Sequence, residues 1–285
     1  MKKILITGAT GFVGRNLVRQ FSENREYELI CLVRDLEKAQ KFLPTNAIIT
    51  NDIPSISTID VEYVVHLASY LSSRDDIQTV RSILNANVLY GTEVLNALRE
   101  CRNLKFINFG SFAEYRNGPE KPDCAYIYTA AKRAFRPILD YYAKLGNWDY
   151  IHLIPYTIYG GENTQKKLID YVKESIDANK PVDMSPGYQV SDFIHIDDVI
   201  DCVKYLIDHP ERWEGKKGED YYLGTGRGFS IRELAAIIEN KEGKKCNINW
   251  GGLPYRAHDV MHAVAPIGKL LDLGWQAKIR LEDSI

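Results

Sequence analysis

The stretch Ile4-Leu-Ile-Thr-Gly-Ala-Thr-Gly-Phe-Val-Gly14 decides the fold. Its first three residues are typical of a short buried strand, and the apolar periodicity from Phe12 to Phe21 predicts a helix. Glycines at positions 8, 11 and 14 lie between them, and such a turn brings backbone N–H groups and the positive end of a helix close to a diphosphate. The residues expected to bind a dinucleotide here are Gly8, Thr10, Gly11, Phe12 and Val13. Taken alone, the motif also fits a turn that needs glycine only for packing.

Further strands and helices alternate along the first half of the chain. Apolar runs predict strands at 28–33, 47–50, 61–67 and 104–109, and helical patterns run over 74–101 and from 128 through 142. This alternation predicts an α/β fold with a Rossmann-type doubly wound parallel sheet, whose ligands lie beyond the carboxyl ends of the strands.

Composition narrows the class of protein. With 285 residues, 45% of them hydrophobic and 26% charged, the chain has enough apolar residues for a large core. A net charge of −2 offers no basic surface for nucleic acid, and no apolar run of about 18 residues predicts a membrane span. The sequence enters a strand at once, without a signal peptide, so we expect a cytoplasmic protein. Five scattered cysteines form no C-x-x-C, which predicts neither a disulfide framework nor a metal site.

The end of the second strand indicates which dinucleotide is bound, because the adenosine ribose lies there. Arg34 follows that strand and is suited to a 2′-phosphate, which favours NADP; if Asp35 bound the ribose instead, the cofactor would be NAD. The other residues expected to line the cofactor at strand ends are Asp52, Ile53, Leu67, Ala68 and Ser69. His66 lies inside an apolar strand and is interpreted as a core residue rather than a base.

Catalytic residues are predicted at the fifth strand and the helix that follows it. Ser111 lies at the strand's carboxyl end, and Tyr128 and Lys132 are four apart, on one face of a helix. The lysine is expected to lower the phenol pKa and hold the nicotinamide ribose, so that Tyr128 exchanges a proton while a hydride moves. With 18 tyrosines in the chain, Y-x-x-x-K alone would be a commonplace helix face; its place after the glycine loop and Ser111 makes it a predicted triad. Asn87, within the preceding helix, is expected to need buried polar partners near the cofactor.

At this point the chain resembles the extended short-chain dehydrogenase/reductases, specifically the NAD(P)-dependent nucleotide-sugar epimerase/dehydratase family. The resemblance covers nearly the whole length. It rests on TGATGFVG (7–14), VVHLAS (64–69), NANVLYGT (85–92), INFGSFAEY (107–115), YTAAK (128–132), IPYTIYGGEN (154–163), DFIHIDDV (192–199), YLGTGRGFSIRELAAII (222–238), PYRAHDV (254–260) and LGW (273–275).

The resemblance implies two regions and a set of substrate contacts. Residues 1–155 would form the NAD(P)-binding domain with the catalytic residues, and 156–285 would form mainly a smaller C-terminal α/β region that binds a nucleoside diphosphate-sugar, partly interleaved with the sheet. It also implies Pro155 beside the nicotinamide, and substrate contacts from Ser111, Thr157, Gln189, Arg256 and Asp259. Arg256 matches the diphosphate-binding arginine of the family, and a homodimer is expected from packing of the long helices.

Departures from the family pattern bear on the reaction. Many members have an arginine in R-D-F, whereas this chain has Gln189-Val-Ser-Asp-Phe193, so one phosphate contact is missing. Sugar 4,6-dehydratases carry an Asp-Glu pair after the catalytic Ser or Thr, and Phe112-Ala113 stands there, which disfavours dehydration.

Arg34 and the short connection from Ser111 to Tyr128 resemble the bacterial 4-ketoreductases that make CDP-abequose or CDP-paratose. We therefore expect an NADPH-dependent 4-ketoreductase. The alternatives are an NAD-dependent nucleotide-sugar 4-epimerase, a reductase of small carbonyls and a non-catalytic NADP-binding protein; Arg256 argues against the second of these, and the intact Tyr128 and Lys132 against the third.

Three shorter segments complete the predictions. The region 160–163 is a loop before an amphipathic helix that begins near Leu168, and 213–218 is a polar loop before a strand at 221–223. Asp197 and Asp198 are interpreted as caps at a helix N-terminus rather than as metal ligands.

Overall fold

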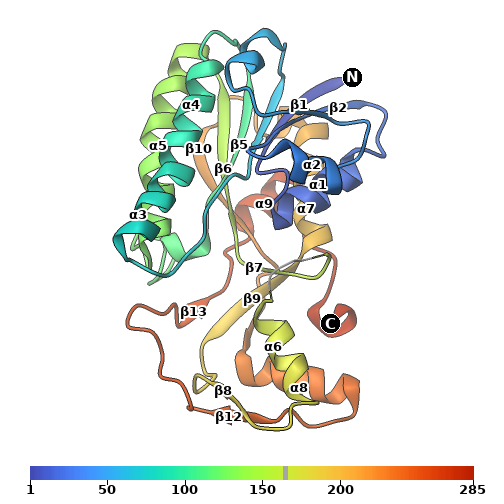
Figure 1. Cartoon of the computed structure of the whole chain (residues 1–285), viewed down its shortest axis with the longest axis vertical. Helices are drawn as coiled ribbons and strands as arrows, with labels where there is room; N and C mark the ends of the chain where they lie inside the picture. The colour runs from blue at the N-terminus through green and yellow to red at the C-terminus, as the bar shows by residue number, and fades with distance from the viewer. Residues whose placement is uncertain (163–165) are drawn as a thin grey trace.

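A seven-stranded sheet forms the larger part of the molecule (Figure 1). The computed structural model describes residues 1–162 and 166–285, so Asn163 of the predicted loop lies outside the described residues. The strand order is β10-β6-β5-β4-β1-β2-β3, and every neighbouring pair is parallel. The strands are β1 (Lys2–Thr7), β2 (Tyr27–Leu32), β3 (Ile48–Thr50), β4 (Tyr63–His66), β5 (Lys105–Phe109), β6 (Asp149–Pro155) and β10 (Lys217–Leu223). The predicted doubly wound parallel sheet is confirmed, and its order reverses direction between β1 and β4.

Helices cover both faces of this sheet. Successive residues of β1 belong to opposite cores: Ile4 and Ile6 pack with the first set of helices below, and Leu5 packs with the second. A strand buried on both sides is therefore apolar throughout, as the sequence indicates. The first set is α1 (Phe12–Phe21), α2 (Leu36–Phe42), α7 (Ile196–Asp208) and α9 (Gly268–Leu273); the second is α3 (Ile77–Leu84), α4 (Tyr90–Ala97) and α5 (Ile127–Gly146).

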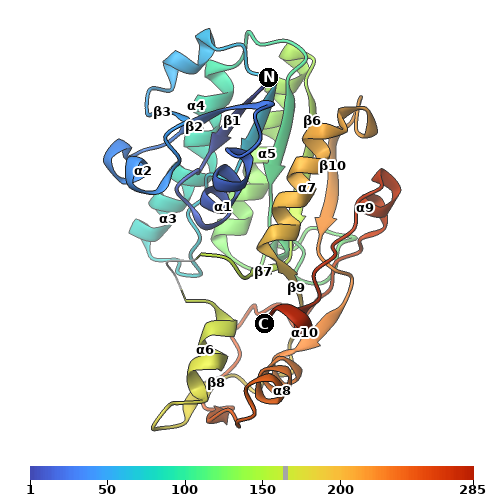
Figure 2. The same cartoon turned by 90° about the vertical axis from the view of Figure 1, so that its right-hand side faces the viewer.

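A smaller region lies beyond the carboxyl ends of the strands (Figure 2). It has its own apolar core, which includes Val172, Phe193 and Leu234. Its strands are β7 (Thr157–Tyr159), β8 (Val182–Met184), β9 (Val190–His195), β11 (Gly228–Ser230), β12 (Ile248–Trp250) and β13 (His262–Ala263), and its helices are α6 (Leu168–Ser175), α8 (Ile231–Glu242) and α10 (Leu281–Ser284). Because α7 and β10 return to the large sheet, the chain crosses between the two regions several times; the boundary at 155 stays a prediction.

The helix predicted over 74–101 is shorter and has an irregular centre. It begins at Ile77, where Asp76 caps it by accepting the N–H of Thr79, and it ends at Ala97. Between α3 and α4, residues Asn85–Leu89 form a π-helical segment, η2. Such a segment re-aims the side chains it carries, here including Asn87.

Two other predictions need correction. The prediction of a polar loop at 213–218 is wrong at both ends. At one end β10 already begins at Lys217; at the other, Trp213 is fully buried and its indole N–H donates to the carbonyl of Leu206. The cap of α7 is His195, whose Nδ1 accepts the N–H of Asp197. Asp198 instead accepts the N–H groups of residues 278 and 279, and so anchors the C-terminal segment.

The remaining short elements are the 3₁₀ turns η1 (Pro54–Thr58), η3 (Phe112–Glu114) and η4 (Pro210–Arg212). Among the residues described, no helix has the length and apolar character needed to cross a bilayer.

Candidate active site

The glycine loop between β1 and α1 has the shape that a dinucleotide diphosphate needs. Gly8 has φ of 69°, and a Cβ there would lie 2.6 Å from the backbone nitrogen of Ala68. A Cβ on Gly14 would lie 2.2 Å from the carbonyl oxygen of Gly8. At Gly11 the space is open apart from that same oxygen, and no side chain caps the N-terminus of α1. The first N–H groups of α1 are thus directed at an open surface, which suits an anionic diphosphate.

Thr10, Phe12 and Val13 lie at the same turn, all half-buried. The ammonium of Lys167 lies 3.4 Å from the centre of the Phe12 ring, which brings a cation from the smaller region to the helix start. The predicted diphosphate-binding residues are therefore gathered at one surface.

At the adenosine end, Arg34 and Asp35 are both exposed. The Asp35 carboxylate caps α2 by accepting the N–H of Lys38 on one oxygen, at 2.9 Å. Asp52 is exposed and Ile53 half-buried, beyond the end of the neighbouring strand β3. Part of the hydrogen-bonding capacity of Asp35 is therefore used within the fold, beside an exposed guanidinium.

The segment after β4 is held by two buried polar side chains. Thr7 Oγ1 lies 2.9 Å from Nδ1 of His66 and accepts the N–H of Ala68 at 3.2 Å. Asn87 accepts the N–H of Tyr70 at 2.9 Å and donates to its carbonyl at 3.1 Å. The polar partners expected for Asn87 are thus the backbone groups of Tyr70, which follows the half-buried Leu67 and Ala68 and the exposed Ser69.

His66 is a core residue. It is 3% exposed, it stacks on Phe135, and burial lowers its pKa to about 3. A neutral, enclosed imidazole in the sheet is not placed to exchange protons with a substrate.

The predicted catalytic residues come together at the end of β5. Ser111 Oγ and the Tyr128 hydroxyl are 2.6 Å apart, and both side chains are buried. Lys132, one helical turn further along α5, donates from its ammonium to the carbonyl of Phe109 at 2.8 Å. A strand end and a helix face therefore place the hydroxyl pair and the ammonium around one point.

The electrostatics of Tyr128 differ from the expectation. Burial raises the pKa of Tyr128, and the hydrogen bond with Ser111 offsets only part of this. The expected lowering of the phenol pKa by Lys132 is wrong for this structure, because the ammonium is directed at the Phe109 carbonyl. Burial also lowers the pKa of Lys132 to about 8. Tyr128 is consequently protonated near neutral pH, as a proton donor must be.

Pro155, the predicted neighbour of the nicotinamide, ends β6 of the large sheet. Of the predicted substrate residues, Thr157 pairs with Phe193 of β9. Gln189 precedes β9 in the smaller region and donates from its amide to Ser185. All three residues are half-buried.

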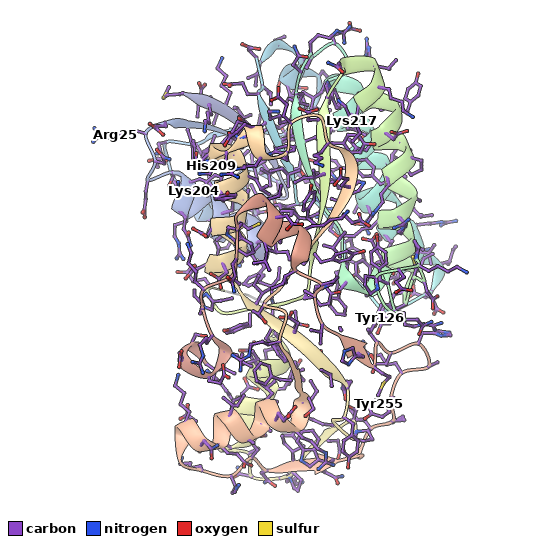
Figure 3. All side chains as sticks on the ribbon, turned by 180° about the vertical axis from the view of Figure 1, so that it is seen from behind. Arg25, Tyr126, Lys204, His209, Lys217 and Tyr255 are labelled. Atoms are coloured by element: carbon purple, nitrogen blue, oxygen red, sulfur yellow. The ribbon has the colours of Figure 1, made fainter. Side chains whose placement is uncertain are left out.

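The segment 254–260 approaches the catalytic helix through an aromatic residue. Tyr126 stacks on Tyr128, with ring centres 6.4 Å apart, and donates to Asp259 at 3.4 Å. Figure 3 shows Tyr126 at the lower end of the large region and Tyr255 below it, on the smaller one. Arg256 is exposed on this segment. Through Tyr126 the segment thus contacts the start of α5 next to Tyr128, an arrangement that the sequence does not predict.

Comparison with known proteins identifies the family. The model of the NAD dependent epimerase/dehydratase family matches residues 4–224, which is most of the chain. The chain belongs to this family. As a member of the NAD dependent epimerase/dehydratase family it is an NAD(P)-dependent enzyme.

Relatives of known name match over the full length. The chain is 29% identical to the CDP-abequose synthase of Salmonella muenchen, with 100% of this chain and 96% of that protein covered. The CDP-abequose synthase of Yersinia pseudotuberculosis is 24% identical, with 99% and 98% covered. Among solved structures, the UDP-glucuronic acid 4-epimerase of Bacillus cereus, in complex with UDP-glucuronic acid and NAD, superposes with a TM-score of 0.85 at 20% identity, covering 99% of this chain and 96% of the other. Identities this low among the solved structures show a shared fold alone.

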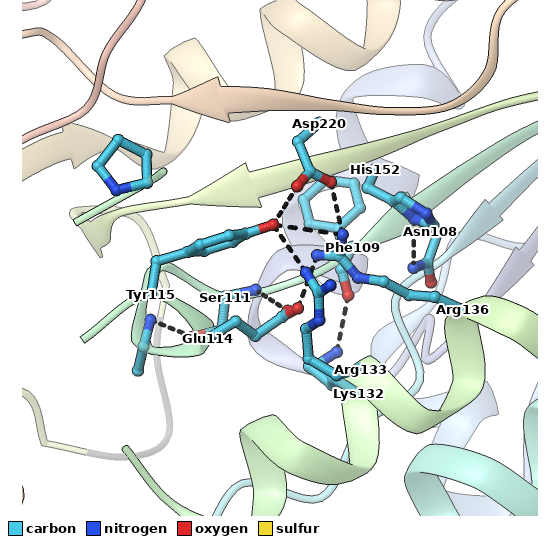
Figure 4. Close-up of polar contacts among 12 residues, drawn as sticks. Asn108, Phe109, Ser111, Glu114, Tyr115, Lys132, Arg133, Arg136, His152 and Asp220 are labelled. Atoms are coloured by element: carbon cyan, nitrogen blue, oxygen red, sulfur yellow. Dashed lines mark hydrogen bonds and ion pairs between the residues drawn. The ribbon is translucent and has the colours of Figure 1, made fainter. Parts of the chain in front are cut away.

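Sequence reasoning missed a buried ionic cluster directly behind Ser111 (Figure 4). Glu114 accepts the N–H of Ser111 at 2.8 Å and pairs with Arg136 at 2.6 Å, and Arg136 also pairs with Asp220 at 2.5 Å. A local signal was present, because Ser111-Phe-Ala-Glu114 is a capping box. Since Glu114 is fully buried and already bound on both oxygens, it does not supply the acid or base that a dehydratase needs.

Proposed function

We propose that this enzyme uses NADPH to reduce the 4-keto group of a nucleoside diphosphate 4-keto-6-deoxy sugar. The observation that carries the proposal is the buried pair of hydroxyls, Ser111 Oγ and Tyr128 OH, 2.6 Å apart beside Lys132. The full-length similarity to CDP-abequose synthases supports the substrate class.

The chain's own residues have distinct tasks in this reaction. Ser111 donates a hydrogen bond to the carbonyl oxygen of the sugar, and Tyr128, protonated because burial raises its pKa, donates the proton that converts this oxygen to a hydroxyl. Lys132, whose ammonium is held at the Phe109 carbonyl, is the residue that would bind the nicotinamide ribose. Bound in its reduced form, the nicotinamide dinucleotide supplies the hydride.

NADP is proposed over NAD because of the end of β2. Arg34 is exposed there, and a guanidinium suits a phosphate with two hydrogen bonds. Asp35, the residue that would select the free ribose of NAD, is occupied as the cap of α2.

Substrate contacts are proposed for Thr157, Gln189, Arg256 and Asp259. Thr157 pairs with β9 and Gln189 precedes that strand, whereas Arg256 and Asp259 lie on the segment that reaches Tyr126. Arg256 is the proposed partner of the diphosphate, since a bidentate guanidinium fits that group.

We also propose a homodimer formed through the helices on one face of the sheet. Leu84 and Leu89 between α3 and α4, and Tyr141 and Leu145 on α5, are large apolar side chains that remain 43–59% exposed. Helices α3 and α5 lie together at one side of the molecule (Figure 1). Light scattering on the eluting protein gives its molar mass, and a monomeric mass contradicts the proposal.

The alternative is an NAD-dependent nucleotide-sugar 4-epimerase. Several solved structures that share the fold are described as epimerases of UDP-sugars, and two of them are complexes with NAD and either a UDP-sugar or its fluoro analogue. An epimerase would return the hydride to the opposite face of the sugar, and so would retain its NAD through turnover.

The test is NADPH consumption, with NADH in parallel, on a panel of CDP-, dTDP- and GDP-linked 4-keto-6-deoxy sugars. We expect stoichiometric oxidation of NADPH with one nucleotide series, and a loss of at least about 100-fold in kcat in Tyr128→Phe. Tyr142→Phe is the matched control, since Tyr142 lies on the same helix and its hydroxyl donates to Asn96, away from the catalytic hydroxyls, at 3.3 Å. Interconversion of ordinary nucleotide sugars by protein that purifies with NAD, without NADPH consumption, would establish the epimerase instead.

A further inference from the structure

A buried carboxylate holds the backbone of the catalytic serine. Glu114 ends the short turn η3 and is 0% exposed. Its Oε1 accepts the N–H of Ser111 at 2.8 Å, and its Oε2 accepts from Arg136 at 2.6 Å. Ser111 Oγ in turn accepts the N–H of Ala113 at 3.3 Å. The rotation of Ser111, and so the direction of its hydroxyl toward Tyr128, depends on this small turn.

Arg136, the partner of Glu114, is itself held by a second carboxylate, and this limits the movement of Glu114. The other end of the guanidinium pairs with Asp220 of β10 at 2.5 Å. Asp220 also accepts from the Tyr115 hydroxyl, which accepts from Arg133 at 2.9 Å (Figure 4). A bidentate arginine between two carboxylates keeps Glu114 directed at Ser111.

Glu114 also places a negative charge beside the catalytic ammonium. Lys132 donates to the carbonyl of Phe109, two residues before Ser111, whose N–H the Glu114 carboxylate accepts. Burial has the largest effect on the pKa of Lys132 and lowers it; the charge of Glu114 raises this pKa, and the charge of Arg136 lowers it.

Other titratable groups around the cluster do not replace this charge. From β4, His66 faces Lys132, but its imidazole is neutral because burial lowers its pKa to about 3. From the loop before α5, the Cys124 thiol lies near Glu114, and burial raises the pKa of that thiol. Tyr126 and Tyr128 complete the surroundings, and burial raises the pKa of both. Burial raises the pKa of Glu114 itself, and the pairing with Arg136 opposes this rise, so the negative charge near Lys132 depends on that ion pair.

We propose that Glu114, locked by Arg136, is a positioning residue for the reduction: it holds Ser111 in register with Tyr128 and places a carboxylate beside the backbone that Lys132 binds. The proposal rests on the proposed reductase function, because the register of Ser111 and Tyr128 has its effect on the reduced carbonyl. It assigns a role to a residue that touches neither substrate nor cofactor.

The first test compares Glu114→Gln with wild type in the pH profile of kcat. Glutamine keeps an oxygen for the Ser111 N–H but removes the charge, so the pKa values of Lys132 and Tyr128 both fall. The active form has both groups protonated. In the variant these groups therefore lose their protons, and the enzyme its activity, at a lower pH than in wild type. We expect the basic limb of the profile to move down by about one pH unit or more, with kcat reduced about tenfold and KM within about twofold.

Glu233→Gln is the matched control, because Glu233 closes a capping box of the same kind with Ser230, at the start of α8 in the smaller region. We expect its basic limb and kcat to stay at the wild-type values. If Glu233→Gln shifts the limb as much as Glu114→Gln does, the shift does not come from the charge of Glu114 and the proposal is overturned.

Glu114→Asp keeps the charge and shortens the side chain by one methylene. It should lower kcat about tenfold through the lost Ser111 contact while leaving the basic limb in place, and it decides the matter if the glutamine variant does not fold. Equal kcat in Glu114→Asp and wild type would overturn the positioning of Ser111.

A readout without turnover separates this proposal from the proposed function. The Lys132 side chain, labelled with ¹³C at Cε and assigned with Lys132→Met, is titrated by NMR in the cofactor-free protein. A lower midpoint in Glu114→Gln than in wild type supports the charge role even if no keto sugar is reduced, and equal midpoints overturn that role even if reduction is observed.

Discussion

Asp192 is the residue whose loss should most weaken the junction between the sheet and the smaller region. It lies on β9, is 0% exposed, and accepts the N–H groups of Thr225, Gly226 and Ala265 at 2.8–3.2 Å. The Thr225 hydroxyl adds a fourth bond at 2.7 Å. One carboxylate thus joins β9 to the turn after β10 and to the segment after β13.

The cost of Asp192→Ala follows from these donors. Each buried donor left without an acceptor costs about 1–3 kcal/mol, and water entering the space offsets part of the sum, so we expect a loss of roughly 3–6 kcal/mol. At about 2 °C per kcal/mol for a chain of this size, the melting temperature should fall by roughly 6–12 °C.

The assay is thermal unfolding followed by circular dichroism, with Asp183→Ala as the matched control. Asp183 lies on β8, is exposed and bonds to Asn249 at 2.7 Å, so its loss should change stability by about 0.5 kcal/mol or less. A melting temperature for Asp192→Ala within about 2 °C of the control would refute the assigned role of these hydrogen bonds.

Two further predictions concern pH and cofactor. Burial lowers the pKa of His66 to about 3, whereas in the unfolded chain it is near 6.5, so the unfolded state takes up a proton first and stability falls as the pH drops through this window. Between pH 6.5 and 5, the free energy of unfolding measured by urea titration should fall by roughly 2 kcal/mol more in wild type than in His66→Asn. An equal dependence of this free energy on pH in the two proteins would show that the imidazole titrates normally in the fold. In steady-state kinetics, Arg34→Ser should raise KM for NADPH about tenfold or more and leave KM for NADH unchanged, because only the 2′-phosphate loses a partner; an equal rise for both cofactors would count against that contact.

The parts of the fold that could be predicted are those with a local signature. The strands of a doubly covered sheet are continuous apolar runs, so β1, β2, β4 and β5 were found to within two residues at each end. The pairing of Ser111 with Tyr128 followed from register, since one ends a strand and the other begins the next helix.

The parts that could not be predicted depend on contacts between distant segments. Arg136 and Asp220 are separated by 84 positions, and nothing near either residue indicates the other. Trp213 stands in a polar stretch, yet it is buried at the edge of the sheet, with Lys105 of β5 above its ring. In both cases β10 decides the outcome, because that strand comes late in the chain and completes the edge of a sheet begun two hundred residues earlier.

The position of β10 also links the catalytic residues to the substrate side. At one point along this strand Asp220 holds Arg136, and through it Glu114 and the backbone of Ser111. Just beyond its end, Thr225 binds Asp192 of β9, the strand that pairs with β13 close to Arg256 and Asp259. Contacts of β10 thus reach Ser111 through Arg136 and Glu114, and contacts just beyond its end reach the strand next to the segment of Arg256 through Asp192. A strand in the interior of a parallel sheet resists displacement, but β10 is an edge strand paired only with β6 within the sheet. Its contacts with Arg136 and Asp192 therefore do more than stabilise the edge of the sheet. Because both are made by β10 and the turn after it, a shift of this strand changes the distance between the hydroxyl pair and the proposed substrate residues.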